Sequence, residues 1–374
     1  MKKVLYVATS DVHIYTFHLP YLKWLKENGC EVHLAVENRG NYNIPYVDQF
    51  FFLPFPCTPF DHINFTTYKK LKSIIEINNY DLVHCHTPIP SVITRLASVK
   101  ARKTGTKVLY TAHGFHFYKG CSLKYWLTYY PVEWILSSIT DGIITINKED
   151  YSYINRKMWH KDSYYIKGIG IDSTKFSTLH FLKRNETRKT LGYEQKDFIL
   201  LYVAEFIFRK NHQFIIDALP ELANKIPHLK IIFAGKGILL EKMKTHALKL
   251  GVENAIDFLG FINNVEQYAA IADIGISSSR QEGLGLGLAE EMLCSVPIIA
   301  SIDKGHKEMI DDGINGYFFA QGDKKRFIAS IVKLYDNPEL RKQMGKHAFE
   351  KAQEFKIENS LNSMTDIYNK YLKD

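Results

Sequence analysis

Short apolar runs alternate with amphipathic stretches of helical length over most of the chain. Five such runs in the first half have the length and composition of strands that are buried on both faces. They are residues 3–8, 31–36, 81–86, 107–112 and 141–146. The helical stretch after the first run ends at Asn28 and Gly29, a pair typical of a helix C-terminus. This alternation predicts a parallel β-sheet covered by helices.

The alternation breaks between Trp159 and Asp197, where the sequence is polar and irregular, and then starts again. The later runs are residues 198–204, 229–235, 255–260, 273–279, 296–301 and 316–320. We therefore expect an α/β protein with two Rossmann-like domains, 1–188 and 189–356. The amphipathic segment 357–374 is predicted to be a helix that crosses back and packs on the first domain. Open parallel sheets bind ligands at the carboxyl ends of their strands, so a cleft between the two facing domains is the expected site.

The composition agrees with a globular protein. A length of 374 residues fits about two domains, and 46% hydrophobic with 24% charged residues is close to the average. No apolar run reaches the roughly 20 residues that a membrane-spanning helix needs. The first apolar run meets Asp11 too early for a signal peptide. Five cysteines without a CxxC pair favour reduced thiols and a cytoplasmic location.

Positive charge is concentrated in the first half of the chain. The formal net charge is +8, and no Asp or Glu occurs between Asp81 and Glu133. Lysines alternate with aromatic residues in FHFYKGCSLKYWLTYYPVEW, a combination that suits an anionic membrane surface. A basic helix face beside an ordinary aromatic core explains the same residues. Nucleic acid is disfavoured as a partner, because the chain has no helix-turn-helix, zinc-finger or RNA-binding signature.

The most specific motif is SSSRQEGLGLGLAEEMLCSVPIIAS, which spans a strand end, a glycine-rich turn and a helix. Gly283, Gly285 and Gly287 would let the backbone approach a phosphate at the helix N-terminus, where free N–H groups favour anions. Glu282 and Glu290 bracket this turn and could accept hydrogen bonds from two sugar rings on either side of a diphosphate. The motif therefore predicts a nucleotide-sugar site.

The spacing of Glu282 and Glu290 resembles the E-x7-E motif of retaining, family-4 glycosyltransferases of the GT-B fold. The resemblance covers the whole chain and implies that Glu282 contacts the transferred sugar while Glu290 holds the ribose. It also implies donor contacts from the backbone of Gly283, Leu284 and Gly285. The alternative is that both glutamates are ordinary loop and helix-surface carboxylates.

A second segment, YVAEFIFRKNHQF, resembles the family's diphosphate-binding G-R…K-G segment. Lys210 occupies the lysine position, and Glu205 stands where the family has arginine. We expect Lys210 to bind the diphosphate, with Arg209 as the second cation. Gly235, at another strand end, is predicted to lie near the nucleotide, although a tight turn also explains it.

Histidines follow two strands of the first domain. TAHG resembles the family's T-x-H segment, which implies that His113 is the catalytic-site histidine. His86 matches the second histidine of an H-x-H segment, and with His116 it is assigned to the acceptor side. His84 is expected to be structural. A half-buried, hydrogen-bonded residue is the alternative for each.

The loop after the first strand has Asp11 and His13 where many relatives of the family carry Gly-Gly. We expect these two residues to contact the acceptor or the donor sugar. Asp11 is also a plausible helix N-cap.

A metal site is an alternative for the four histidines that follow these strands. They could bind zinc, but no carboxylate lies near them in sequence, and such a site would leave the two glutamates unexplained. The four are His84, His86, His113 and His116. The resemblance implies that no metal is essential and no cofactor is needed. The sequence therefore predicts no metal site.

Together these patterns predict a glycosyltransferase that moves a hexosyl or N-acetylhexosaminyl unit from a UDP-sugar to a lipid-linked glycan. The resemblance implies retention at the anomeric carbon, with His113 orienting the reacting groups. Lys210, Arg209 and the helix start would stabilise the leaving diphosphate. The motifs look like those of bacterial capsule and exopolysaccharide enzymes, which implies a polyprenyl-diphosphate acceptor and a peripheral location at the inner membrane face.

Three alternatives stay open at this stage. A sugar-nucleotide epimerase would isomerise or hydrolyse the UDP-sugar without an acceptor. A metal-dependent hydrolase would be sensitive to chelators. A non-catalytic subunit would bind the nucleotide sugar and activate a partner; intact Glu282, Glu290 and Lys210 argue against it, whereas Glu205 keeps it open.

Overall fold

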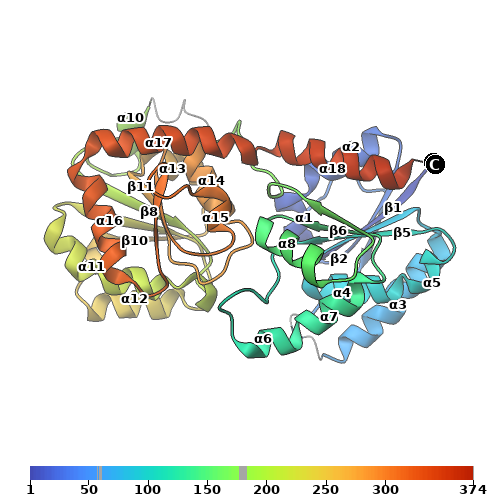
Figure 1. Ribbon diagram of the computed structural model, residues 1–374. Coiled ribbons are helices and arrows are strands. Elements are labelled where there is room, and N and C mark those ends of the chain that lie inside the picture. Colours follow the sequence, from blue (N-terminus) through green and yellow to red (C-terminus); the bar gives the residue numbers. More distant parts are fainter. Residues whose placement is uncertain (57, 59–60, 177–182, 374) are drawn as a thin grey trace. The chain divides into compact units, whose positions relative to one another are not determined.

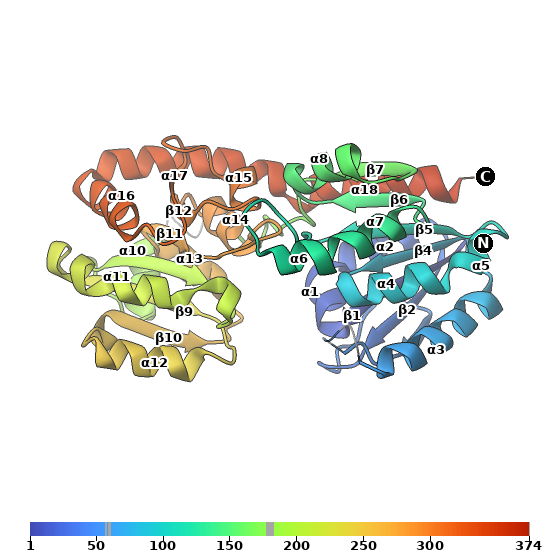
Figure 2. The ribbon, with the colours of Figure 1, turned by 60° about the horizontal axis from the view of Figure 1, so that its bottom comes forward.

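A computed structural model describes residues 1–56, 58, 61–176 and 183–373 of the chain. The chain forms two compact units, and each is a parallel β-sheet with helices on both faces (Figures 1 and 2). The first unit comprises residues 1–170 and the segment from Ile357 onward, and the second comprises Ile171–Lys356. The predicted pair of Rossmann-like domains is therefore confirmed.

The first unit contains a seven-stranded sheet in the order β3-β2-β1-β4-β5-β6-β7, with every neighbouring pair parallel. The apolar runs of the sequence form its inner strands, which are buried on both faces as parallel sheets require. The bounds are β1 Lys3–Ser10, β2 Glu31–Glu37, β3 Gln49–Phe52, β4 Leu82–His86, β5 Lys107–Ala112, β6 Gly142–Thr145 and β7 Asp162–Tyr165.

The helices of the first unit connect successive strands, except for the last one, which arrives from the far end of the chain. They are α1 Asp11–Phe17, α2 Leu19–Glu27, α3 Ile63–Asn78, α4 Pro88–Ala97, α5 Val99–Arg102, α6 Leu123–Thr128, α7 Tyr130–Ser137, α8 Lys148–Lys157 and α18 Ile357–Leu372. Tyr368 of α18 stacks on Trp24 of α2, and its hydroxyl bonds to His84 Nδ1 at 2.8 Å. Tyr371 donates to Asp162 of β7 at 2.9 Å. These buried contacts make α18 part of the first unit.

The second unit contains a six-stranded parallel sheet in the order β10-β9-β8-β11-β12-β13. Its strands are β8 Phe198–Val203, β9 Leu229–Ala234, β10 Ile256–Gly260, β11 Ile274–Ser277, β12 Ile298–Ser301 and β13 Gly316–Phe319. Its helices are α10 Arg184–Thr190, α11 His212–Lys225, α12 Leu240–Lys249, α13 Val265–Ile271, α14 Leu286–Leu293, α15 His306–Met309, α16 Lys324–Asp336 and α17 Pro338–Ala352, with 3₁₀ turns η1 Phe208–Lys210, η2 Glu253–Ala255 and η3 Gln353–Phe355.

The order of strands reverses once in each sheet, between β1 and β4 and between β8 and β11. In open α/β sheets, ligands bind outside the carboxyl ends of the strands at such a reversal. Ligands are therefore expected at the segments that follow β1, β4 and β5 in the first unit and β8, β11 and β12 in the second.

The boundary between the units lies at Gly170 and Ile171, earlier than the predicted position of 188/189. The sequence hid this point because β7 is short and only half buried, so the polar stretch around it resembled a linker. Ile171 already belongs to the second unit, where its N–H donates to Phe355 O at 3.0 Å. Arg188 of α10 donates to the buried Asp273 of the same unit at 2.8 Å.

Within the described residues, no helix has both the length and the apolar composition needed to cross a lipid bilayer.

Candidate functional site

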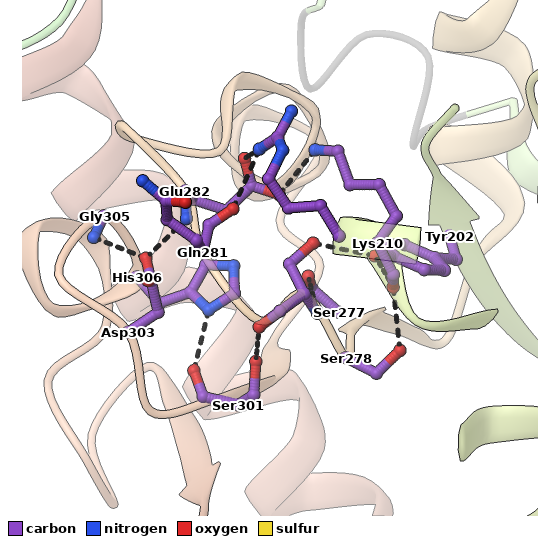
Figure 3. A network of polar contacts seen from close by, with 12 residues as sticks. Tyr202, Lys210, Ser277, Ser278, Gln281, Glu282, Ser301, Asp303, Gly305 and His306 are labelled. Carbon is purple, nitrogen blue, oxygen red and sulfur yellow. Dashed lines mark hydrogen bonds and ion pairs between the residues drawn. The ribbon is translucent and has the colours of Figure 1, made fainter. Parts of the chain in front are cut away.

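The predicted nucleotide-sugar motif lies at the strand reversal of the second unit, between β11 and α14. Hydrogen bonds of Tyr202, on the neighbouring strand β8, and of Ser278, in the motif itself, connect the motif to the turn that carries Lys210 (Figure 3). Tyr202 of β8 donates to Lys210 O at 2.7 Å and lies 2.9 Å from Ser279 Oγ. Ser278 donates to Asn211 O at 2.8 Å. Two segments far apart in sequence are thereby fixed side by side.

Two cations converge on Glu282 in this site. Lys210 Nζ donates to Glu282 Oε1, and Arg209 Nη1 lies 3.2 Å from Glu282 Oε2. Arg209 also donates to Gln281 O at 2.8 Å. Burial alone would raise the pKa of Glu282, but the charges of Lys210 and Arg209 lower it to about 2. Glu282 is therefore a buried, ionised carboxylate, and the three side chains together carry a net positive charge.

Glu205 stands where the family segment has arginine, and Arg209 is the predicted second cation. The Glu205 residue is exposed, whereas Arg209 and Lys210 both reach Glu282. The two predicted cations are thus brought together at one carboxylate. Their contact with a diphosphate stays a prediction.

The loop of Glu282 is shaped by Asp303, which follows β12. One carboxylate oxygen of Asp303 accepts from the backbone N–H of Glu282 at 3.0 Å and of Gly305 at 2.7 Å. Gly305 has no room for a side chain, because a Cβ there would lie 2.8 Å from Leu284 O. Sequence reasoning missed Asp303, and its place directly after a predicted strand was the available signal.

The helix that follows the glycine-rich turn begins without a side-chain cap. Gly285 is the N-cap residue of α14, with φ of 102°, a backbone conformation that glycine adopts without steric cost. The first N–H groups of a helix favour an anion at this end. Leu284 beside it is buried, so its backbone rather than its side chain is the part available to a ligand.

Gly235 is a predicted donor contact, and the packing around it also explains why this position is a glycine. A Cβ at this position would lie 2.0 Å from Ala204 O, because the segments that leave β8 and β9 run in close contact. The same close approach gives the hydrogen bond from Ala204 N–H to Ala234 O at 2.9 Å. Contact of Gly235 with a nucleotide stays a prediction.

Glu290 differs sharply from Glu282. It lies half-buried on α14, and burial raises its pKa to about 7, with Glu266 adding to the rise and Lys175 opposing it. Near neutral pH this carboxyl is therefore divided between the protonated and ionised forms. The adjacent Glu291 is fully buried, and burial raises the pKa of its carboxyl even further.

Histidines gather at the strand reversal of the first unit. His86 at the end of β4 has Nδ1 3.3 Å from His113 Nε2, in the loop after β5. His13 of α1 lies beside His113, with ring centroids 5.1 Å apart. His18, between α1 and α2, has Nε2 3.1 Å from His13 Nε2. Burial lowers the pKa of all four, that of His13 to about 4, so they are neutral imidazoles at pH 7.

The structure thus brings together three of the acceptor-side and catalytic predictions, His13, His86 and His113. It adds His18, which sequence reasoning missed; its position five residues after His13 was the available signal. His116 lies apart from this cluster and stacks on Tyr129, with ring centroids 4.7 Å apart.

Two further predicted positions have structural partners. His84 is hydrogen-bonded through both ring nitrogens, to Tyr368 Oη and to Thr111 Oγ1, each at 2.8 Å, as expected for a structural residue. Asp11 accepts backbone N–H groups from the loop after β2, including those of Arg39 and Gly40. The N-cap of α1 is Ser10, not Asp11. Contact of Asp11 with an acceptor stays a prediction.

The structure groups the histidines differently from the set that the sequence offered as possible metal ligands. The four histidines that follow the strands, His84, His86, His113 and His116, do not together have the spacing of metal ligands. Among the described residues, the group with the spacing of metal ligands is instead His13, His18 and His113, whose ligand atoms lie within 4.8 Å of one another.

Comparison with known sequences gives matches over both units. The family model described as "Glycosyl transferases group 1" matches residues 183–351, and the model "Glycosyl transferase 4-like" matches residues 3–147. EpsD of Bacillus subtilis (strain 168), itself only provisionally assigned as a glycosyltransferase, is 42% identical over 99% of this chain and 97% of its own length. N-acetyl-alpha-D-glucosaminyl L-malate synthase of Bacillus anthracis is 24% identical over 94% of this chain and 92% of its own length.

Comparison with solved structures supports the same architecture. HepE of Anabaena, solved in complex with UDP and glucose, matches with a TM-score of 0.80 at 18% identity. The match covers 99% of this chain and 100% of the HepE chain. At this level of identity, the likeness establishes a common fold.

Proposed function

Because this chain belongs to the GT-B-fold, family-4 glycosyltransferases and resembles those of exopolysaccharide synthesis, we propose that it uses a UDP-sugar as donor. The transferred unit is a hexosyl or N-acetylhexosaminyl group, and the acceptor is a growing glycan on a polyprenyl diphosphate. Transfer proceeds with retention at the anomeric carbon. Support for UDP includes the UDP and glucose bound to HepE, which has the same fold.

The observation that carries the donor assignment is the convergence of Lys210 and Arg209 on Glu282 beside the uncapped start of α14. A diphosphate needs positive charge and N–H donors, and this arrangement supplies both within one loop cluster. When a diphosphate binds, Lys210 and Arg209 share their hydrogen bonds between it and Glu282. As the sugar–phosphate bond breaks, the same cations stabilise the charge that grows on the leaving group.

The two glutamates have separate tasks in this proposal. Glu282 stays ionised, so it can only accept hydrogen bonds, which suits hydroxyl groups of the transferred sugar. Glu290 can donate or accept at neutral pH, and we assign it to the ribose hydroxyls. His113, kept neutral by burial, orients the reacting groups and is not a covalent catalyst.

Support for a lipid-linked acceptor comes from an apolar groove of about 1140 Å³ in the first unit, between α3, α4, α6 and α7. Its lining includes Phe65, Tyr125 and Val132, whose side chains are 62%, 40% and 40% exposed. Exposed apolar surface of this extent marks an interaction site. The occupant that we propose is the hydrocarbon chain of the acceptor lipid.

The charges around the groove suit an anionic lipid surface. Lys124 lies in the lining, and Lys69 extends over the exposed ring of Phe65 at 4.4 Å. The lining also contains two acids: Glu133, which pairs with Arg95 at 2.9 Å, and the partly exposed Asp61. Cations next to exposed aromatic rings bind at the level of anionic headgroups.

The donor assignment is tested by measuring nucleotide release from UDP-, GDP- and ADP-sugars, with and without a polyprenyl-diphosphate-glycan fraction. We expect release from a UDP-sugar that needs the lipid fraction and disappears in Glu282→Ala. NMR of the product reports whether the anomeric configuration is retained. Release or isomerisation without any acceptor would instead favour an epimerase, and a folded protein that binds UDP but never turns over would favour a non-catalytic subunit.

The groove is tested separately by flotation with anionic vesicles. Tyr125→Asp and Val132→Asp should weaken vesicle binding, because each introduces a charge into the apolar lining. Ile238→Asp is the matched control, since Ile238 is 87% exposed but lies in the second unit. Equal flotation of all three variants would remove the groove from the proposal and leave the donor assignment untouched.

A further inference from the structure

Three histidines of the first unit surround a common point. His13 comes from α1, His18 from the junction of α1 and α2, and His113 from the loop after β5. Their ring centroids lie 4.9, 5.1 and 5.7 Å apart in the three pairs. His13 and His113 are half-buried and His18 is buried. We refer to these three residues as the histidine trio.

The spacing of the trio agrees with the geometry of a metal ion. A tetrahedral zinc ion with Zn–N bonds of about 2.0–2.1 Å holds its ligand nitrogens about 3.3–3.4 Å apart. The Nε2 atoms of His13 and His18 are 3.1 Å apart, and the ligand atoms of all three histidines lie within 4.8 Å of one another.

Two members of the trio, His18 and His113, have outer hydrogen-bond partners of the kind that ligating histidines use. His18 Nδ1 lies 3.0 Å from the hydroxyl of Tyr6, which leaves Nε2 as the ligand atom. His86 Nδ1 contacts His113 and orients its ring. Within the described part of the chain, the other nitrogen of His86, Nε2, is buried without a hydrogen-bond partner.

We propose that His13, His18 and His113 bind a divalent transition-metal ion of the zinc class, with one coordination position left open. Three neutral imidazoles favour zinc, cobalt, nickel or copper over magnesium and calcium, which prefer oxygen ligands. The ion keeps most of its charge, so the open position takes water or an anionic oxygen. The inference does not involve Lys210 and Arg209 of the proposed donor site, but it shares His113 with the proposed function, in which this residue orients the reacting groups.

The test uses the full chain without a polyhistidine tag, stripped of metal and titrated with Co²⁺. We expect one Co²⁺ per chain, with visible absorption bands of the intensity that four-coordinate cobalt gives. Zn²⁺ should abolish these bands at equimolar concentration, and Mg²⁺ should not. Absence of stoichiometric binding to the wild-type chain, or displacement by Mg²⁺, overturns the proposal.

Variants then assign the ligands. His13→Gln and His18→Gln should each weaken Co²⁺ binding by about 10–100-fold or more, as loss of a ligand or its support does at metal sites. His116→Gln is the matched control, because His116 is a half-buried histidine of the same unit that lies outside the trio. Equal affinity of His13→Gln and His116→Gln would contradict the assignment.

A second measurement keeps the test decisive if the buried His18 cannot be replaced without unfolding. A ligand that binds only the folded state raises the unfolding temperature. Zn²⁺ should therefore raise the midpoint of thermal unfolding in wild type and His116→Gln, and not in the half-buried variant His13→Gln. An equal rise in all three proteins would overturn the proposal.

Discussion

Ionisable side chains gather at the strand reversal of both units, but the cluster around Glu282 in the second unit is charged, whereas the histidine cluster of the first unit is neutral. In the second unit, Lys210 and Arg209 hold Glu282 ionised although it is buried. In the first unit, His18 and His113 have no such counter-charge among the residues that the structure describes, and burial keeps them neutral. Burial therefore does not determine the charge of a site by itself. The partners that the fold brings to each group decide it.

Removal of Lys210 breaks this contrast most directly and has the largest expected effect. Lys210→Ala leaves Glu282 with Arg209 alone and removes a cation from the proposed leaving group. We expect turnover to fall about 10²–10³-fold, the range for loss of one stabilising group in an active site. Lys210→Arg is the control that keeps the charge. Normal turnover of Lys210→Ala would remove Lys210 from the catalytic site.

The second prediction concerns donor affinity. At pH 8, where the Glu290 carboxyl is mostly ionised, Glu290→Ala should weaken UDP-sugar binding about 10–100-fold, because hydrogen bonds to a charged group contribute about 1.5–3 kcal/mol. Isothermal titration calorimetry measures this directly. Glu291→Gln is the matched control, since Glu291 is the next residue and is fully buried. If Glu290→Ala binds the donor as tightly as this control, the ribose assignment is wrong.

The third prediction sharpens the contrast between the two glutamates through pH. The pKa of Glu290 rises on folding from 4.5 to about 7, so ionisation destabilises the folded state as pH rises through this window. At pH 8, the free energy of unfolding of Glu290→Gln, measured by denaturant titration, should therefore exceed that of wild type by on the order of 1–3 kcal/mol. At pH 4.5 the two proteins should have the same free energy of unfolding. Glu282→Gln should show the opposite sign, because its lowered pKa stabilises the fold above about pH 4.5 and this gain is lost as pH falls toward 2.

The prediction with the smallest expected effect concerns the neutral histidine cluster of the first unit. Tyr6→Phe removes the hydroxyl that lies 3.0 Å from His18 Nδ1 and leaves the packed ring in place. We expect a loss of about 1 kcal/mol in the free energy of unfolding, measured by urea denaturation. The loss should be similar at pH 6 and pH 8, because His18 is neutral in both. A loss that appears only at pH 6 would show that His18 is charged there, contrary to the comparison.

Much of the architecture could be predicted from the sequence. Parallel strands buried on both faces are continuous apolar runs, so β1, β4 and β8 were evident. The glycine-rich turn between Glu282 and Glu290 was evident as well, because its spacing is local. By contrast, β7 was missed: a short, half-polar strand at the sheet edge has no distinctive pattern.

What the sequence could not supply is the relation between residues that are distant along the chain. The contact of Arg209 with Glu282 depends on where the turn η1 meets the loop of Glu282. Asp303 acts through hydrogen bonds to backbone N–H groups, which no residue pattern specifies. His18 joins the other histidines because a short helix returns it to the end of β1. The opposite pKa shifts of Glu282 and Glu290 likewise follow from burial and neighbours.

The last helix, α18, has a consequence for how the protein is made. Domains usually fold as they leave the ribosome, the first one first. Here the first unit lacks Tyr368, the buried partner of His84, until the ribosome has translated the whole second unit. The second unit, in contrast, is continuous in sequence from Ile171 to Lys356 and can close as soon as it emerges. During synthesis the order of completion is therefore the reverse of the order along the messenger RNA, and the nascent first unit waits with an uncovered strand face.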